Sequence, residues 1–174
     1  MKKTILTYGL ASAASSITLA AIIFQILNSR RFGLEDLLGY TSMVLSALII
    51  FFGIRSYRDN AEGGHISFGS GFKAGMMITL IAAVCYVAAV EVMVFGLMPG
   101  IPESFRVCMV ERAHTEGASA QKVIETARTA QRYKDMYGQP ATNALMSFAE
   151  TVPVGLIASA ISAAILRRKT APPV

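Results

Sequence analysis

Four long apolar stretches alternate with polar segments along this chain. They cover residues 5–27, 37–54, 74–98 and 145–166. A hydrocarbon core about 30 Å thick is crossed by roughly 20 mostly apolar helical residues, because an α-helix rises about 1.5 Å per residue. We therefore predict an all-α membrane protein with four transmembrane helices, forming one integral membrane domain over residues 1–174.

The first apolar stretch follows Lys2 and Lys3, as it does in a secretory signal peptide. Its uncharged run continues to Leu27, beyond the roughly 7–15 apolar residues typical of such a peptide. We interpret this stretch as an uncleaved first span.

The polar segment between the third and fourth spans predicts a helical hairpin over about residues 102–138. Pro102 suits the first turn of a helix, and Gly117 suits its end. Ser119 can cap a second helix, which Gly138 ends. The apolar residues of that second helix recur at helical spacing: Val123, Ala127, Ala130 and Tyr137. We interpret this stripe as a packing face that lies across the outer ends of the spans, with a dedicated partner-binding surface as the alternative.

The composition fits a membrane domain better than a soluble one. The chain is 53% hydrophobic and 16% charged, whereas charged residues make up about 25% of an average soluble domain. The net charge of +5 comes from sixteen Lys and Arg residues that cluster at helix ends and form no stripe with interleaved aromatic residues. We therefore predict the lipid bilayer, and no nucleic acid, as a partner.

The positive charges also predict the orientation. In a four-span chain the N-terminus, the loop between the second and third spans and the C-terminus share one side, and this side is strongly basic. Its basic residues are Lys2, Lys3, Arg55, Arg58, Lys73, Arg167, Arg168 and Lys169. On the opposite side, Arg30 and Arg31 are balanced by Glu35 and Asp36, and the hairpin is nearly neutral. Lys and Arg residues in short segments next to transmembrane helices are retained on the cytoplasmic side of the membrane. We therefore expect both termini in the cytoplasm and the hairpin outside.

Two carboxylates lie within the spans, and they are the candidate functional residues. Glu91 follows Lys73 by eighteen residues, and Glu150 precedes Arg167 by seventeen, so both lie about 26 Å from the basic side. A carboxylate costs roughly 2.5–3.5 kcal/mol at the bilayer centre, which favours a position inside the bundle or in a wet cavity. Polar residues of the first two spans can reach the same level: Thr18, Gln25 and Tyr40.

Glu91 and Glu150 can therefore form a proton- or cation-binding site. The alternative is that each carboxylate reaches the outer interface or pairs with a basic residue of the hairpin. Those basic residues are Arg106, Arg112 and His114.

Small residues recur every four positions in the first and last spans. They are Ser12, Ser16 and Ala20 in one and Gly155, Ser159 and Ala163 in the other. Such ridges let helix backbones approach closely, so we expect the first and fourth spans to pack together, with a homodimer contact through the same ridge as the alternative.

No catalytic, metal or cofactor motif stands out. The glycine spacing at residues 69–74 matches a dinucleotide-binding turn but lacks the surrounding βαβ unit, and His65 is isolated from other metal ligands. Cys85 and Cys108 lie at different depths, so we expect no internal disulfide. We predict a protein that is not an enzyme and has no cofactor and no metal.

Several sequence pieces together resemble a bacterial membrane-protein family, DUF4199, a domain of unknown function. The pieces are KKTILTYG at residues 2–9, FFGIRSYRD at 51–59, GHISFG at 64–69, FKAG at 72–75, YKDMY at 133–137 followed by Pro140, PVGLI at 153–157 and ILRRK at 165–169. The resemblance implies four membrane helices in a bacterial cytoplasmic (inner) membrane. It implies no activity and no functional residues.

We therefore expect a structural or accessory membrane component whose partners are lipid and either a second copy or another membrane protein. The alternative from a different class is a small transporter or ion-coupled carrier that uses Glu91 and Glu150.

Overall fold

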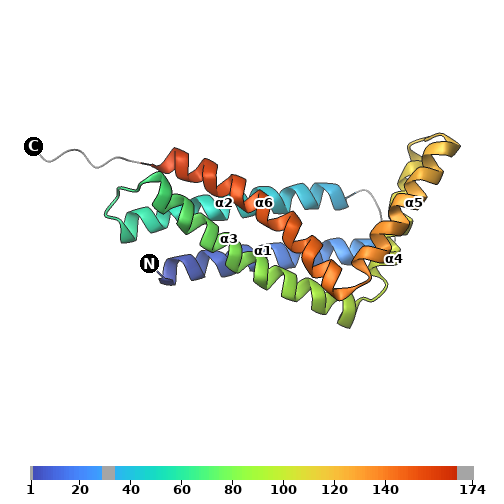
Figure 1. The fold of residues 1–174 in the computed structure, drawn as a ribbon, viewed down its shortest axis with the longest axis horizontal. Coiled ribbons are helices and arrows are strands. Elements are labelled where there is room, and N and C mark those ends of the chain that lie inside the picture. The colour runs from blue at the N-terminus through green and yellow to red at the C-terminus, as the bar shows by residue number, and fades with distance from the viewer. Residues whose placement is uncertain (1, 29–33, 168–174) are drawn as a thin grey trace, which may run out of the picture. The chain divides into compact units, whose positions relative to one another are not determined.

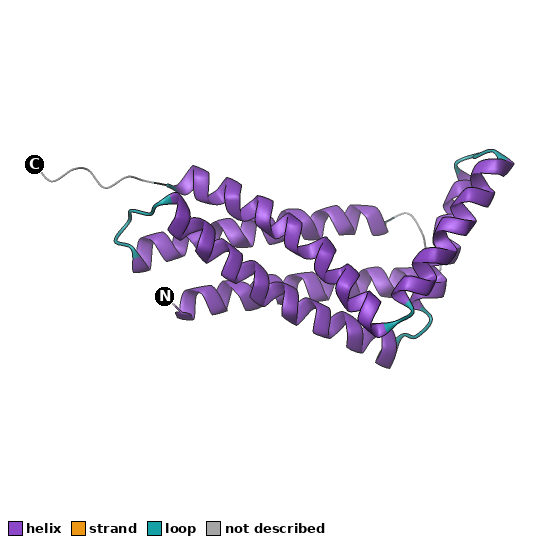
Figure 2. Ribbon diagram, viewed as in Figure 1, coloured by secondary structure: helices purple, strands orange, loops and turns teal. Residues whose placement is uncertain are grey.

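The computed structural model describes residues 2–28 and 34–167, and the elements in these ranges are helices (Figures 1 and 2). They are α1 (Lys2–Asn28), α2 (Glu35–Ala61), α3 (Phe68–Glu91), the π-helix η1 (Val92–Leu97), α4 (Ile101–Thr115), α5 (Ala120–Tyr137) and α6 (Pro140–Leu166). Four of the basic residues used for the orientation lie outside the described residues: Arg30, Arg31, Arg168 and Lys169.

Four helical stretches are long and apolar enough to cross a membrane, which confirms the predicted number among the described residues. They cover Lys2–Leu27, Leu37–Ala61, Phe68–Leu97 and Pro140–Leu166. The predicted spans lie inside these stretches except for Met98, which caps η1. The helices are longer than the apolar runs because their polar ends stay helical, as residues 55–61 and 68–73 show.

The chain forms two compact units. The first unit comprises residues 1–17, 41–86 and 148–174, and the second comprises residues 18–40 and 87–147. In the first unit, the start of α1, the connection between α2 and α3, and the end of α6 lie at the same end (Figure 1).

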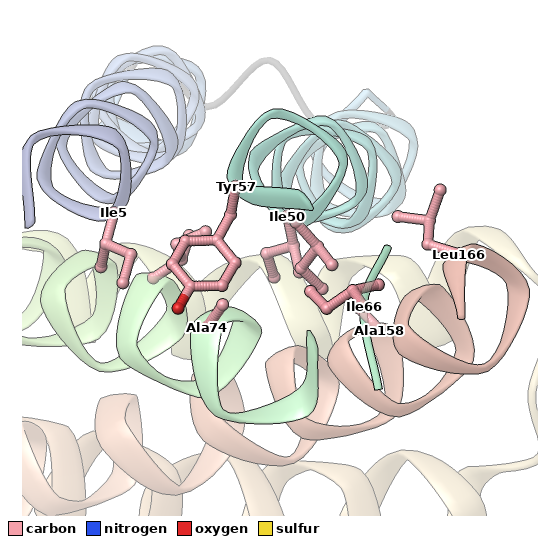
Figure 3. Close-up of a cluster of buried hydrophobic side chains, with 9 residues drawn as sticks. Ile5, Ile50, Tyr57, Ile66, Ala74, Ala158 and Leu166 are labelled. Carbon is pink, nitrogen blue, oxygen red and sulfur yellow. The ribbon is translucent and has the colours of Figure 1, made fainter. Parts of the chain in front are cut away.

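The core of the first unit gathers side chains from four helices and one loop (Figure 3). Ile54 and Ile78 are fully buried, and Ile66 of the α2–α3 loop packs with them. Gly63 and Gly64 form the turn before Ile66 with φ values of 62° and 84°, a backbone conformation that glycine adopts without a Cβ clash. The two glycines therefore let the loop fold back so that Ile66 enters the core.

Helices α3 and α6 meet through small residues in the first unit. A Cβ atom on Gly71 would lie 3.2 Å from the Ala163 Cβ, and one on Gly75 would lie 2.6 Å from the Ser159 Oγ. A Cβ on Gly155 would overlap the Thr79 side chain. The small-residue ridge of the fourth span therefore packs against α3, so the prediction that it packs against the first span is wrong at these positions. The four-residue spacing predicts a close contact with some helix. The glycines on α3 allow that helix to be α3.

The corresponding ridge of the first span contacts α2. The Ser16 and Ser46 hydroxyl oxygens lie 3.1 Å apart, within hydrogen-bond distance. Hydroxyl pairs of this kind link helices in lipid, where water does not compete for the bond.

Helices α4 and α5 pack against each other, and their ends follow the predicted signals. Pro102 lies in the first turn of α4, and Gly117 follows that helix with a φ of 71°. The Ser119 Oγ caps α5 by accepting a hydrogen bond from the Lys122 backbone N–H at 3.3 Å. Ala130, from the predicted apolar stripe, is fully buried. Both predicted helices are therefore present.

Candidate functional site

Glu91 is the last residue of α3 before the helix widens into η1. In η1 the backbone hydrogen bonds span five residues, as the 2.7 Å bond from the Met98 N–H to the Met93 oxygen shows. π-Helices are rare in proteins, but those that do occur often lie at functional sites. The Glu91 Oε1 is buried and has no hydrogen-bond partner among the described residues. Glu91 is therefore a half-buried carboxylate, held at an irregular point of its helix.

Asn143 is a second buried polar group with an unused hydrogen-bonding atom. It lies in the first turn of α6 and is 1% exposed. Its Nδ2 has no hydrogen-bond partner in the part of the chain that the structure describes. An amide nitrogen is a donor and a carboxylate oxygen is an acceptor, so Asn143 and Glu91 have complementary chemistry.

By residue number alone, the register of the α3–α6 contacts in the first unit leads toward these two residues. In the contacts of α3 with α6, a step of four residues along α3, from Gly71 to Gly75, matches a step of four back along α6, from Ala163 to Ser159. Continuing the same steps pairs Glu91 with Asn143 in sequence register, and both belong to the second unit. Analysis of the sequence alone missed Asn143.

Glu150 has a different environment from that of Glu91. It belongs to the first unit and is exposed on α6, on the same helical face as Pro153 and Ile157. Tyr86 lies within electrostatic range of its carboxylate. Because Glu91 belongs to the second unit, the shared site that we expected for the two carboxylates stays a prediction. The polar residues expected at their level are exposed: Thr18, Gln25 and Tyr40.

The hairpin holds an ion-pair network of its own. Arg106 donates from Nε to both Glu103 carboxylate oxygens at 3.0 and 3.1 Å, and the Lys134 ammonium lies 2.8 Å from Oε2. The hydrogen bond from Arg106, followed by that from Lys134, lowers the pKa of Glu103 to about 2. Glu103 raises the pKa of Arg106 in return. Arg106, one of the cations expected to pair with an intramembrane carboxylate, thus binds Glu103 within α4, and Lys134 ties α5 to the same carboxylate.

Aromatic rings add a second link between the hairpin helices. Phe105 of α4 meets Tyr133 of α5 edge to face at a centroid distance of 6.3 Å, and Tyr133 stacks on Tyr137 at 6.2 Å. Such pairs contribute about 0.5–1.5 kcal/mol each beyond the area they bury. The hairpin is therefore held by charge and ring contacts between its own two helices.

The cysteines and the acidic residues show no metal-binding arrangement in the described ranges. Neither Cys85 nor Cys108 forms a disulfide bond. No group of three or more His, Cys, Asp or Glu residues lies close enough to hold a metal ion within residues 2–28 and 34–167.

One comparison with known proteins gave a match. The model of a family described as "Protein of unknown function (DUF4199)" matches residues 6–168, nearly the whole chain. The searches of curated proteins and of solved structures gave no match.

Proposed function

The chain belongs to the DUF4199 family, whose function is unknown, and we propose that it is a non-enzymatic accessory component of a bacterial cytoplasmic membrane. Its four apolar helices are those of a multi-pass membrane protein. In this proposal, the spans anchor the chain and the α4–α5 hairpin contacts another protein outside the membrane.

The observation that supports this role is the internal stabilisation of the hairpin. Glu103 binds basic residues of both helices, and Phe105 packs on Tyr133 across the same pair. A surface held in this way loses little conformational freedom when it binds, which favours affinity. Many polar residues of α5 stay exposed for such a contact, among them Gln121, Glu125 and Arg128.

The same proposal includes an orientation. Both termini lie in the cytoplasm and the hairpin lies outside, because the described basic residues Lys2, Arg55 and Lys73 flank the spans on the side of the termini.

The experiment for this role exchanges the hairpin. Residues 102–138 are replaced by a flexible linker, and cross-linked partners are recovered from native membranes with the tagged full chain and with the exchanged chain. We expect the exchanged chain to insert into the membrane and to lose its cross-linked partner. A Glu62→Gln variant, which alters one exposed carboxylate between α2 and α3, is the matched control and keeps the partner. Equal recovery with the exchanged chain contradicts the role of the hairpin.

A small ion-coupled carrier is the second candidate function. The buried Oε1 of Glu91 favours it, because unpaired carboxylates inside spans mark ion and proton pathways. Four spans are few for a carrier, so transport requires a dimer. The test measures proton or cation flux in vesicles with Glu91→Gln and Glu150→Gln, and with Glu125→Gln as control. Flux that neither intramembrane substitution changes excludes this function.

A further inference from the structure

Basic residues of four helices lie at one end of the first unit. Four residues of its core have a Lys or Arg next to them or two positions away in the sequence. They are Ile5 with Lys3, Tyr57 with Arg58, Ala74 with Lys73 and Leu166 with Arg167. Figure 3 shows these four core residues in one cluster. The start of α1, the α2–α3 connection and the end of α6 lie at the same end of the unit, so their basic residues gather there (Figure 1).

The chain neutralises only part of this positive charge. Arg58 donates from Nε to Asp59 at 2.7 Å, and the Arg55 Nε lies 3.9 Å from the same carboxylate. Glu62 accepts a hydrogen bond from the Tyr57 hydroxyl at 3.1 Å. The cations that form no ion pair with any described residue are exposed, and they are Lys2, Lys3, Lys73 and Arg167. This end of the unit is therefore open to an external anion.

Lys73 also begins an exposed apolar stripe on α3. Lys73, Met77, Leu80 and Val84 follow one another at spacings of four, three and four residues, so they lie on one face of the helix. Met77, Leu80 and Val84 keep 54%, 42% and 60% of their surface exposed. Lys73 lies in the second turn of α3, near the end at which this membrane span begins. A ligand that contacts both the lysine and the stripe needs an anionic head and an apolar tail.

We propose that this face of α3 binds an anionic phospholipid of the surrounding membrane, with its phosphate at Lys73 and an acyl chain along Met77, Leu80 and Val84. Basic residues at the ends of membrane helices attract anionic headgroups. The other cations at this end of the unit strengthen that attraction. The proposal goes beyond the accessory role, because it requires only that α3 spans a membrane.

The apolar stripe favours a lipid over an acidic protein or a soluble anion. A soluble anion pairs with the ammonium of Lys73 and leaves Met77, Leu80 and Val84 without a partner. A phospholipid in the same bilayer satisfies the charge and covers the stripe in one molecule. Charge complementarity and the continuity of the stripe with Lys73 therefore point to the same ligand.

The test uses a single tryptophan as the reporter. The chain has no Trp, so Phe68→Trp places one fluorophore five residues before Lys73. The full chain with this substitution is embedded in lipid nanodiscs, which expose both membrane faces to solution. Phosphatidylglycerol, which is anionic, and phosphatidylcholine, which is zwitterionic, are supplied with brominated chains that quench the tryptophan on contact. We expect phosphatidylglycerol to bind at least about fivefold more tightly, the range that one cation near the membrane surface provides.

Charge variants of the reporter chain locate the site. Lys73→Gln is expected to lower the preference for phosphatidylglycerol about fivefold. Lys73→Arg keeps the charge and is expected to keep the preference. Lys122→Gln, the same loss of charge at an exposed position of α5, is the matched control and leaves the preference unchanged. Salt of about 1 M is expected to abolish the preference of the reporter chain that keeps Lys73, and this measurement keeps the test valid if Lys73→Gln fails to fold.

The proposal is overturned by equal quenching with the two lipids, by a preference that Lys73→Gln or high salt leaves intact, or by displacement of the brominated lipid from the site. The competitors for displacement are millimolar glycerol phosphate, which has the headgroup phosphate without acyl chains, and an oligoglutamate peptide. Displacement by glycerol phosphate identifies a site for a soluble anion, and displacement by the peptide identifies a site for an acidic protein. None of these results affects the hairpin exchange experiment, so failure of this inference is distinguishable from failure of the accessory role.

Discussion

Gly155 of α6 lies so close to Thr79 of α3 that a Cβ atom on the glycine would overlap the threonine side chain. The neighbouring pair of Gly75 and Ser159 has the same relationship with the glycine on the other helix. In lipid, apolar burial does not drive helices together, so close packing of this kind stabilises the pair instead. The glycines on both helices are therefore central to the first unit.

We expect Gly155→Ala to destabilise the protein by about 1–3 kcal/mol, the usual cost of an added group in a packed interface. Unfolding in mixed detergent micelles measures this change. Adding Thr79→Ala restores part of the loss, because it removes the atoms nearest to the new methyl group. Gly39→Ala is the matched control, since a Cβ at that helical position meets no atom within 4 Å. Equal effects at Gly155 and Gly39 contradict the close contact.

The four spans were predictable from the sequence because crossing a bilayer requires an apolar length that is read directly from composition. The helix that the α6 ridge packs against was not predictable from the sequence. Gly155, Ser159 and Ala163 predict a close approach to some helix, but any small-residue ridge satisfies that requirement. The glycines that face this ridge, Gly71 and Gly75, lie inside α3.

The Glu103 network predicts a pH response of the hairpin. Hydrogen bonds from Arg106 and Lys134 lower the pKa of Glu103 from 4.5 to about 2. A carboxylate whose pKa is lower in the folded state than in the unfolded state stabilises the folded state at pH values above the unfolded-state pKa. That contribution is lost as the pH falls to the folded-state pKa. We therefore expect the link between α4 and α5 to weaken from about pH 4.5 down to about pH 2.

Carboxyl carbon NMR of the full chain in micelles measures the Glu103 titration directly. Arg106→Gln should move its midpoint upward further than Lys134→Gln does, because the Arg106 bond is the larger cause of the shift. Lys122→Gln, which changes a charge at the cap of α5, serves as the control and leaves the midpoint in place. A midpoint near 4.5 in the unmodified protein contradicts the network.

The ring contact between Phe105 and Tyr133 is expected to stabilise the packing of α4 against α5. Phe105→Ala removes the edge-to-face pair, so we expect faster amide hydrogen exchange in α4 and α5, corresponding to about 1 kcal/mol of lost protection. Ile124→Ala, at an exposed position of α5, is the control. Unchanged exchange after Phe105→Ala means that the charge network alone holds the hairpin.

Orientation is tested by labelling single cysteines in intact cells. In a background without Cys85 and Cys108, we expect Glu125→Cys to react with a membrane-impermeant maleimide and Asn60→Cys to react only after permeabilisation, because basic flanks are retained in the cytoplasm. Both positions are exposed in the structure, so accessibility within the fold does not limit either reaction. The reverse pattern places the hairpin in the cytoplasm.

The candidate site was predictable only in part. Glu91 is visible in the sequence because a charge interrupts an apolar run. Asn143 was missed because it precedes the predicted span at residue 145, and a polar residue outside a span attracts no notice. A signal was present, since Asn143 and Ser147 continue the four-residue spacing of Gly155 and Ser159 backwards along α6. The widening of α3 into η1 has no comparable sequence signal.

The unused amide of Asn143 makes a final prediction about stability. A buried donor without a partner costs about 1–3 kcal/mol, and an apolar side chain of similar size removes that cost. We therefore expect Asn143→Leu to raise the stability of the protein in micelles, while Asn143→Asp, which adds a buried charge, lowers it. Asn60→Leu is the control, because Asn60 is exposed and donates to the Ser56 oxygen at 2.9 Å. A loss of stability in Asn143→Leu shows that the amide does bind a polar partner.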